Sequence, residues 1–577
     1  MTFWNKVRSS FLLSGGEGPL AVLILLLLPL LFLFPQNDWF FRLGDMDTSF
    51  HLGYMLNWDC SAPIFHHSNY HVARTPWLFP GFLAYHFLPP ICANVVFHLL
   101  FYFLSIFSLF FIIKETVNLR AGLISSLLMG LYPFFWEAIT SSYFHGAGIT
   151  FSFLGILFLI LARNKQHQEK FLFISGICAF SLVSLNPAFL LIIFIFLFII
   201  RILSPKGSVL NPLEKLLFFF LGTIAGMLVL GLINTFYDFP FFAFWEALTF
   251  ALTYKIPDFY FMKQVEQLTG ATWLILPIFQ IGIGGTIFCF QKIRNIPFGE
   301  GSYFVFLQII FSLGIVFLST RMISLITYFE YSAVYFIPIT FLAIGSLLSE
   351  IKNASDRQFF LLVGILLFVF FFQFHFRVFD RLFPLNRAPL MVLIFVTVGY
   401  FGYVFFQNKS DWFTGIVCLI FCYLVIFNVT LPKIWEGGNR NKFLAIIKIS
   451  QAIRKSPLFS SFSAQKDPLF WIDRNDPVCY AVANIFQSAE RRMINPFPVE
   501  DWDAPHFKGQ GSGFPFITLR PTAGNIAIII SQDLQYLDKA KKSLEKLKLD
   551  SQLLAEQQFL EGKVHFQVGF VMIIPSK

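Results

Sequence analysis

The chain has 577 residues, of which 56% are hydrophobic and only 13% are charged, and phenylalanine alone occurs 81 times. The charged share is about half of the roughly 25% that is usual in soluble domains, and many apolar runs approach the length of about 20 residues that crosses a bilayer. This composition predicts a polytopic α-helical membrane protein. The net charge of +9 does not indicate a nucleic-acid partner, since Lys and Arg accumulate on the cytoplasmic loops of membrane proteins.

The first apolar run, residues 19–34, follows two cationic residues, Lys6 and Arg8. Because no small-residue cleavage site follows it, we expect an uncleaved first span with the N-terminus in the cytoplasm.

The first outer loop, residues 35–90, opens with RLGDMDTSFHLGYMLNWD, in which Asp45, Asp47 and Asp59 surround His51 although charge is scarce elsewhere. Asp47 can cap a helix that begins at Thr48, which places His51 one turn further on over the same face. We expect a small acidic cluster at the mouth of the membrane bundle. The second part of the loop, NYHVARTPWLFPGFLAYHF, predicts a helix along the membrane interface.

Hydropathy predicts about 13 spans in total. After the first, they lie near residues 91–113, 121–139, 146–162, 171–185, 187–200, 216–235, 271–290, 303–319, 326–348, 359–374, 389–406 and 412–431. Residues 236–270 form a second long outer loop, with an interfacial helix. The distribution of Lys and Arg places the C-terminus outside the cytoplasm, and the low disulfide density favours the cytoplasmic (inner) membrane of a bacterial envelope.

The composition changes after residue 432, where charged residues, Gly and Pro become more frequent. We therefore divide the chain into a membrane domain, residues 1–432, and a soluble extracytoplasmic domain, residues 433–577. NIAIIIS predicts a buried strand, DLQYLDKAKKSLEKLKL an amphipathic helix and KVHFQVGFVMIIP another strand. This strand–helix–strand order favours an α/β fold.

The membrane part, roughly residues 10–430, resembles the GT-C superfamily of membrane glycosyltransferases, which includes protein O-mannosyltransferases, aminoarabinose transferases and oligosaccharyltransferases. The resemblance rests on an acidic first outer loop, on DTSFHL at residues 47–52, on WLFPGFLAYHF, and on a soluble domain after the last span. It implies inverting transfer of a sugar from a polyprenyl-phosphate donor to a glycan, lipid or protein acceptor. Membrane lipids are further expected partners of the chain.

The resemblance implies a catalytic carboxylate in the first outer loop. Asp47 is the first candidate for the base and Asp45 the second, because either aligns with the aspartate of the family. A carboxylate there can take the proton of an acceptor hydroxyl, or it can hold a divalent metal, Mg²⁺ or Mn²⁺. The alternative is an ordinary helix cap for Asp47 and a turn residue for Asp45.

Substrate-binding candidates occur in two outer loops. Glu137 and His145 lie in FFWEAITSSYFHGAG, where members of the family often place an acidic residue. The alternative is an interfacial His and a snorkelling Glu. The histidines of the first loop match no structural zinc site, and we expect them to be solvated, with His51 kept as a substrate-binding candidate. They are His51, His66, His67 and His71.

Arginines supply candidates for binding the donor phosphate, because the guanidinium fork matches phosphate oxygens. They are Arg321, Arg377 and Arg381, with Arg74 of the first loop as a further candidate. The alternative is anchoring to lipid headgroups.

Two other functions compete with glycosyl transfer. A transporter or flippase of lipid-linked glycans predicts charged residues at the middle of the membrane and repeated broken helices, whereas the predicted spans are nearly free of charge. A non-catalytic envelope scaffold predicts that Asp45 and Asp47 are dispensable.

Overall fold

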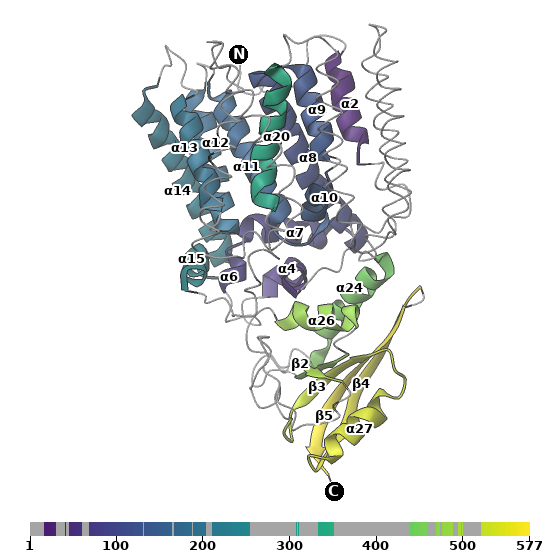
Figure 1. Cartoon of the computed structure of the whole chain (residues 1–577). Coiled ribbons are helices and arrows are strands. Elements are labelled where there is room, and N and C mark those ends of the chain that lie inside the picture. Colours follow the sequence, from purple (N-terminus) through teal and green to yellow (C-terminus); the bar gives the residue numbers. More distant parts are fainter. Residues whose placement is uncertain are drawn as a thin grey trace, which may run out of the picture.

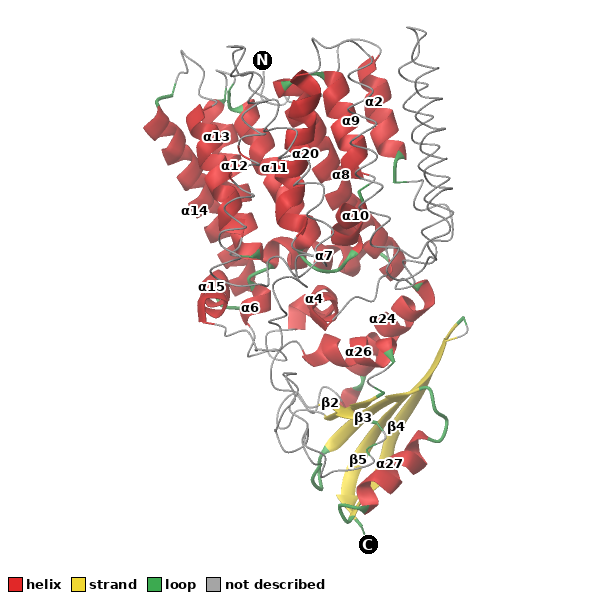
Figure 2. Cartoon of the chain, viewed as in Figure 1, coloured by secondary structure: helices red, strands yellow, loops and turns green. Residues whose placement is uncertain are grey.

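The computed structural model shows a helical bundle, a layer of short helices at one end of it, and a β-sheet beyond that layer (Figures 1 and 2). It describes residues 17–29, 41, 46–60, 69–130, 132–163, 167–186, 189–202, 210–253, 307, 310, 333–350, 439–458, 469–473, 476–487, 494–497, 499, 521–562 and 564–576. The predicted spans beyond residue 253 lie outside this set, except for the one near 326–348.

The bundle confirms the helices predicted for the first half of the chain. Its helices are α2 (Glu17–Leu27), α8 (Pro90–Thr116), α9 (Leu119–Gly130), α11 (His145–Leu161), α12 (Gln168–Leu185), α13 (Leu190–Ile202), α14 (Pro212–Phe236) and α20 (Ala333–Glu350). Among the described residues, α8, α12 and α14 are each long and apolar enough to cross a membrane, and a bent pair of shorter helices makes a fourth candidate. The total of about 13 spans stays a prediction.

That bent pair corrects the single span expected over residues 121–139. The helix breaks between α9 and α10 (Pro133–Thr140), with a bend of 64°. The cause is Pro133, which has no N–H to donate and disfavours a helical residue before it. Two side chains donate to the carbonyl oxygen of Gly130 at the break, namely Trp136 Nε1 at 2.5 Å and the Tyr102 hydroxyl at 3.2 Å. The bend leads the chain into α10 at the end of the bundle near α7 (Figure 1).

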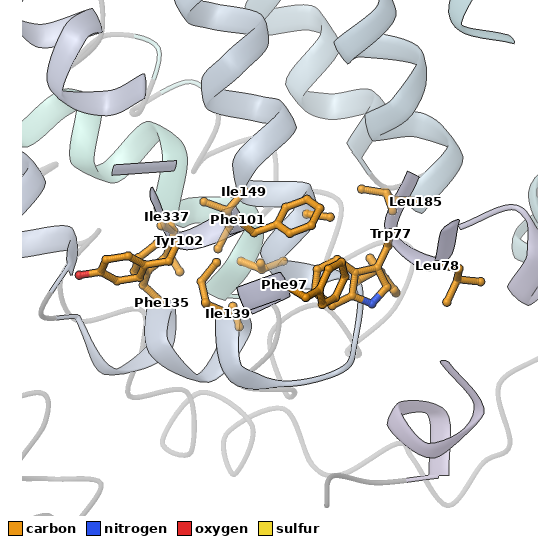
Figure 3. Packing of buried hydrophobic residues seen from close by; sticks show 14 of the residues in the cluster. Trp77, Leu78, Phe97, Phe101, Tyr102, Phe135, Ile139, Ile149, Leu185 and Ile337 are labelled. Carbon is orange, nitrogen blue, oxygen red and sulfur yellow. The ribbon is translucent and has the colours of Figure 1, made fainter. Parts of the chain in front are cut away.

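The first outer loop forms most of the short-helix layer. It contains α4 (Met46–Asn57), η2 (Trp58–Cys60), α6 (Asn69–Val72) and α7 (Thr75–Phe87), and α15 (Ala243–Thr253) of the second long loop lies beside α6 (Figure 1). The predicted interfacial helix is α7, whose Trp77 is buried while Phe87 is 74% exposed. Trp77 packs against Phe97 and Phe101 of α8, with ring centroids 4.4 and 4.9 Å away (Figure 3). This contact fixes α7 to the end of the bundle.

The C-terminal part is built on a five-stranded mixed sheet of order β2-β1-β3-β5-β4. Its elements are α24 (Arg440–Lys455), β1 (Leu469–Ile472), α26 (Pro477–Gln487), β2 (Ile494–Pro496), β3 (Ile526–Ser531), α27 (Tyr536–Glu545), β4 (Leu549–Glu561) and β5 (Val564–Pro575). The predicted strands and helix are β3, α27 and β5. The prediction missed β4, which pairs antiparallel with β5 through a turn at Gly562.

The contact between α4 and α26 joins the two halves of the chain. It places the first outer loop and the C-terminal sheet at the same end of the bundle (Figure 1), as the sequence predicted.

Candidate functional site

The turn between α6 and α7 holds Arg74, which is only 1% exposed. Both residues beside it are attached to the bundle. Thr75 Oγ1 donates to Asn234 Oδ1 of α14 at 2.7 Å, and the Ser184 hydroxyl of α12 donates to the Ala73 carbonyl. Trp77, two residues after Thr75, donates from Nε1 to the Ser142 carbonyl at 2.8 Å. Three separate segments therefore fix the backbone around Arg74.

The guanidinium of Arg74 donates from Nη1 to two imidazoles. It lies 2.5 Å from His51 Nε2 of α4 and 3.2 Å from His71 Nδ1 of α6. Because Arg only donates, both ring nitrogens accept, so neither of them carries a proton. The guanidinium carbon also lies 5.1 Å from the ring centroid of Tyr143 and 4.3 Å from that of Phe144, at the distance of a cation–π contact.

Burial determines the charge of these histidines. It holds the pKa of His51 well below the usual 6.5, and the charge of Arg74 lowers that pKa further, as do His71 and His145 when they are protonated, while the backbone of Ser142 acts in the opposite direction. Burial and then Arg74 lower the pKa of His71 in the same way. Both rings are therefore neutral at pH 7. The expectation of solvated histidines is wrong for His51 and His71, and His66 and His67 lie outside the described residues.

Glu137 and His145 lie in the same layer. Glu137 is half-buried on α10, and His145 is buried at the first residue of α11 rather than exposed at the interface. The ring centroid of Tyr143 lies 4.4 Å from that of His145 and 5.0 Å from that of His51. The charges of Arg74 and Glu137 both act on His145. The structure thus brings together predicted residues from two parts of the chain. His51 and Arg74 come from the first outer loop, and Glu137 and His145 come from α10 and the start of α11.

Asp47 and Asp59 of the opening segment lie at opposite ends of α4. α4 begins at Met46, so Asp47 lies in its first turn, one turn before His51, and not at an N-cap before Thr48. The side chain of Asp47 and the whole of Asp45 lie outside the described part of the chain. Asp59, beyond the other end of α4, forms an ion pair of 3.1 Å with Arg454.

The described residues contain no group of three or more His, Cys, Asp or Glu residues that could hold a metal ion. A metal held by Asp45 and Asp47 therefore stays a prediction. Arg321, Arg377 and Arg381 lie outside the described residues, and phosphate binding by them also stays a prediction.

The sequence reasoning missed His71, Tyr143 and Phe144 as neighbours of Arg74. His71 could have been found, because it precedes Arg74 by three residues and residues at that spacing lie close on a helix. The two aromatic residues belong to another loop, and no local pattern connects them to Arg74.

No family model and no curated protein sequence matches this chain. The structure is similar to that of ArnT from Cupriavidus metallidurans bound to undecaprenyl phosphate, with a TM-score of 0.50 and 13% identity, over 97% of this chain and 98% of that one. It is also similar to the apo oligosaccharyltransferase of Archaeoglobus fulgidus, with a TM-score of 0.42 and 13% identity, over 92% of this chain and 69% of that one. The first likeness extends over nearly all of both chains, and it confirms the fold that the sequence resemblance predicted.

Proposed function

From the GT-C fold of this polytopic membrane chain, we propose that it is a glycosyltransferase that uses a polyprenyl-phosphate-linked sugar donor. The acceptor is an envelope glycan, lipid or protein at the outer face of the cytoplasmic membrane. The observation that carries the proposal is the buried guanidinium of Arg74, which is fixed in the short-helix layer at the end of the bundle. The similar ArnT structure is one with undecaprenyl phosphate bound. Lipid phosphates lie next to the apolar core of a bilayer, and we propose that the short-helix layer lies at that level.

Arg74 supplies positive charge where a donor phosphate would leave. The phosphate gains negative charge as its bond to the sugar breaks, and a preorganised cation stabilises that charge without rearranging. The surroundings of Arg74 are buried, so its field is screened less than it would be in water. The two imidazoles that accept from Arg74 are neutral. They hold the guanidinium in place and do not themselves cancel its charge.

Asp47 is the proposed base, with Asp45 as the second choice. The carboxylate takes the proton of the acceptor hydroxyl, the hydroxyl oxygen attacks the anomeric carbon, and the bond from that carbon to the donor phosphate breaks. A direct displacement of this kind inverts the anomeric centre. Asp47 lies one helical turn before His51, which places the start of α4 beside the Arg74 cluster. A nearby cation favours the ionised carboxylate that a base requires.

Other residues have supporting roles in the proposal. Glu137 and His145 are proposed to contact the sugar or the acceptor, because the ring of His145 packs on Tyr143 of the Arg74 cluster, with centroids 4.4 Å apart, and Glu137 lies on the neighbouring helix α10. Arg321, Arg377 and Arg381 are proposed to bind the donor phosphate or pyrophosphate, because guanidinium groups match phosphate oxygens. The phosphates of membrane lipids have the same oxygens, so the same arginines can also bind lipid headgroups.

The test compares wild type with Asp47→Asn and Asp45→Asn by profiling envelope glycans in cells that lack the wild-type chain, with membrane levels measured in parallel. Asn keeps the size and polarity of Asp and removes the charge. We expect one variant to be present at the wild-type level and to lose transfer by about 100-fold or more, the range for a missing general base.

The control is Asp238→Asn, because Asp238 is exposed and has φ of 63°, a conformation that Asn also adopts readily. It should transfer like wild type. If Asp47→Asn and Asp45→Asn both transfer like wild type as well, then neither is the base, and a transporter or a scaffold becomes the better explanation.

A further inference from the structure

Helix α24 of the C-terminal part contacts the chain on both sides of α4. At its start, the Asn439 backbone N–H donates to the Phe41 carbonyl at 3.1 Å, and the rings of Phe443 and Phe41 pack with centroids 5.3 Å apart. In its last turn it carries Arg454. A helix of 16 residues is about 24 Å long at 1.5 Å per residue, which is long enough to extend past both ends of α4.

Arg454 binds the C-terminal end of α4 with both guanidinium nitrogens. Nη1 donates to the Leu56 carbonyl at 3.1 Å and to Asn57 Oδ1 at 3.2 Å, and Nη2 lies 3.2 and 3.1 Å from the two carboxylate oxygens of Asp59. The last carbonyls of a helix have no partner within the helix, and that end carries partial negative charge. The ion pair alone is half exposed and would contribute little, but the contact with the helix end ties Arg454 to the backbone of α4.

A second helix of the C-terminal part contacts the middle of α4. A Cβ atom placed on Gly53 would lie only 2.6 Å from the Ile485 carbonyl oxygen of α26. The two backbones therefore touch at this point. Helix α4 is thus held before its start, at its middle and at its end by segments that lie 395 residues or more away in the sequence.

We propose that Arg454 is a positioning residue that fixes α4. By fixing α4, it holds His51, and the first turn of α4 that contains Asp47, in place beside Arg74. A helix moves as a nearly rigid rod, so an end that is free to tilt shifts the other end as well. The C-terminal part is then a component of the reaction centre that does not itself touch the reacting atoms. The catalytic consequence rests on the proposed function, whereas the positioning itself does not.

The positioning is tested by hydrogen–deuterium exchange on the full chain in lipid nanodiscs. Arg454→Ala should raise the exchange of amides in residues 50–60 about tenfold, because charge-assisted hydrogen bonds to a helix end are lost and local opening becomes easier. Arg454→Lys should raise it less, since an ammonium group keeps a charge but lacks the fork that reaches two groups at once. The amides of α8 should not change in either variant.

The matched control is Lys455→Ala, which removes the same charge from the same turn at an exposed neighbour. It should leave the exchange of residues 50–60 at the wild-type value. If Arg454→Ala also does so, Arg454 does not position α4. If Arg454→Ala is not obtained folded, Asp59→Asn tests the same contact. We expect it to raise the exchange of residues 50–60 by a smaller factor, and unchanged exchange would contradict the proposal.

Transfer activity gives an independent readout. Arg454→Ala should lower kcat about tenfold with the KM for acceptor unchanged, and Arg454→Lys should recover part of the loss, as expected when a catalytic group is misplaced while substrate still binds. If exchange of residues 50–60 rises in Arg454→Ala but wild type shows no transfer activity, the proposed function is contradicted and the positioning role of Arg454 stands. Unchanged exchange in an active enzyme would contradict the positioning.

Discussion

Arg74 is a fully buried cation whose partners come from three segments of the chain. His51 lies on α4, His71 on α6, and Tyr143 and Phe144 between α10 and α11. A buried guanidinium is costly unless its donors are used. Two neutral imidazole acceptors satisfy donors and leave the charge available to an anion, whereas carboxylates in their place would neutralise it.

Replacing Arg74 should therefore lower both stability and transfer. Arg74→Ala leaves two buried imidazole nitrogens without their donor, at a cost of about 1–3 kcal/mol for each unsatisfied group. Arg74→Lys should recover only part, because one ammonium group lacks the planar fork. Thermal unfolding and transfer measure the effects, with Lys170→Ala, an exposed residue of α12, as the control. A wild-type melting temperature for Arg74→Ala would contradict this account.

The same cluster predicts a pH dependence of stability. The pKa values of His51 and His71 in the folded chain lie below 6.5. Between those values and 6.5 the unfolded chain binds protons that the folded chain does not, so the two histidines lower the free energy of unfolding as the pH drops below about 6.5 and contribute no change above it. Because intrinsic amide exchange itself slows in acid, the readout is the protection factor, the intrinsic exchange rate divided by the observed rate. We expect the protection factors of α4 amides to fall from pH 7 to pH 5.

The double variant His51→Gln/His71→Gln separates these two groups from others that titrate in acid. Gln offers an acceptor oxygen to Arg74 and has no charge change. The protection factors of α4 amides should fall less between pH 7 and pH 5 in the double variant than in wild type. An equal fall in both proteins would show that other groups are responsible.

At the scale of elements, α12 and α14 pack through glycines. A Cβ atom on Gly176 would collide with the Phe219 carbonyl, and one on Gly222 with the Phe173 carbonyl. Helices in lipid gain little from the hydrophobic effect on association, and small residues let their backbones approach and pack closely. This contact matters for the site, since Ser184 of α12 and Asn234 of α14 hold the residues beside Arg74.

Gly222→Ala should destabilise the bundle by about 1–3 kcal/mol, the usual cost of overpacking. Gly226→Ala is the matched control one turn further along α14, because its added Cβ would lie 3.2 Å or more from its neighbours. It should cost less than Gly222→Ala, because its neighbours need to shift by only a few tenths of an ångström, and the better helix propensity of Ala offsets part of the loss. Thermal unfolding in the same detergent compares them. Equal melting temperatures for the two variants would contradict close packing at Gly222.

At the scale of the whole molecule, the structure places the first outer loop and the C-terminal sheet at one end of the bundle (Figure 1). Their position outside the cytoplasm is the sequence prediction. Cysteines introduced one at a time at Lys539 of α27 and at Lys170 of α12 test it, since both residues are exposed. Helix α27 lies beside the sheet (Figure 1), whereas Lys170 lies in the first turn of α12, at the end opposite Ser184, which contacts the turn before α7.

A membrane-impermeant maleimide should label Lys539→Cys in intact spheroplasts and Lys170→Cys only after lysis, with the labelled peptides identified by mass spectrometry. The reverse pattern would mean that the bundle is inserted with the opposite orientation. Both cysteines should be labelled after lysis, which controls for reactivity.

The sequence by itself determined what depends on local pattern. Apolar runs predicted the bundle helices, and NIAIIIS and KVHFQVGFVMIIP predicted two strands of the sheet. The acidic first outer loop with DTSFHL, the WLFPGFLAYHF segment and a soluble domain after the last span together predicted the fold. His51 was selected from the opening segment, Arg74 for phosphate binding, and Glu137 and His145 by their place in the resemblance. These signals are local, since spacing along a helix or strand decides which face meets lipid or core.

Only the tertiary structure decided what depends on contacts between distant segments. The neutral state of His51 and the contact of Arg454 with α4 both required it. Arg74 and His51 are 23 residues apart, and Arg454 and Asp59 are 395 apart. Burial and charged neighbours set the pKa of an imidazole, and both arise when such segments pack together, so no window along the chain contains them.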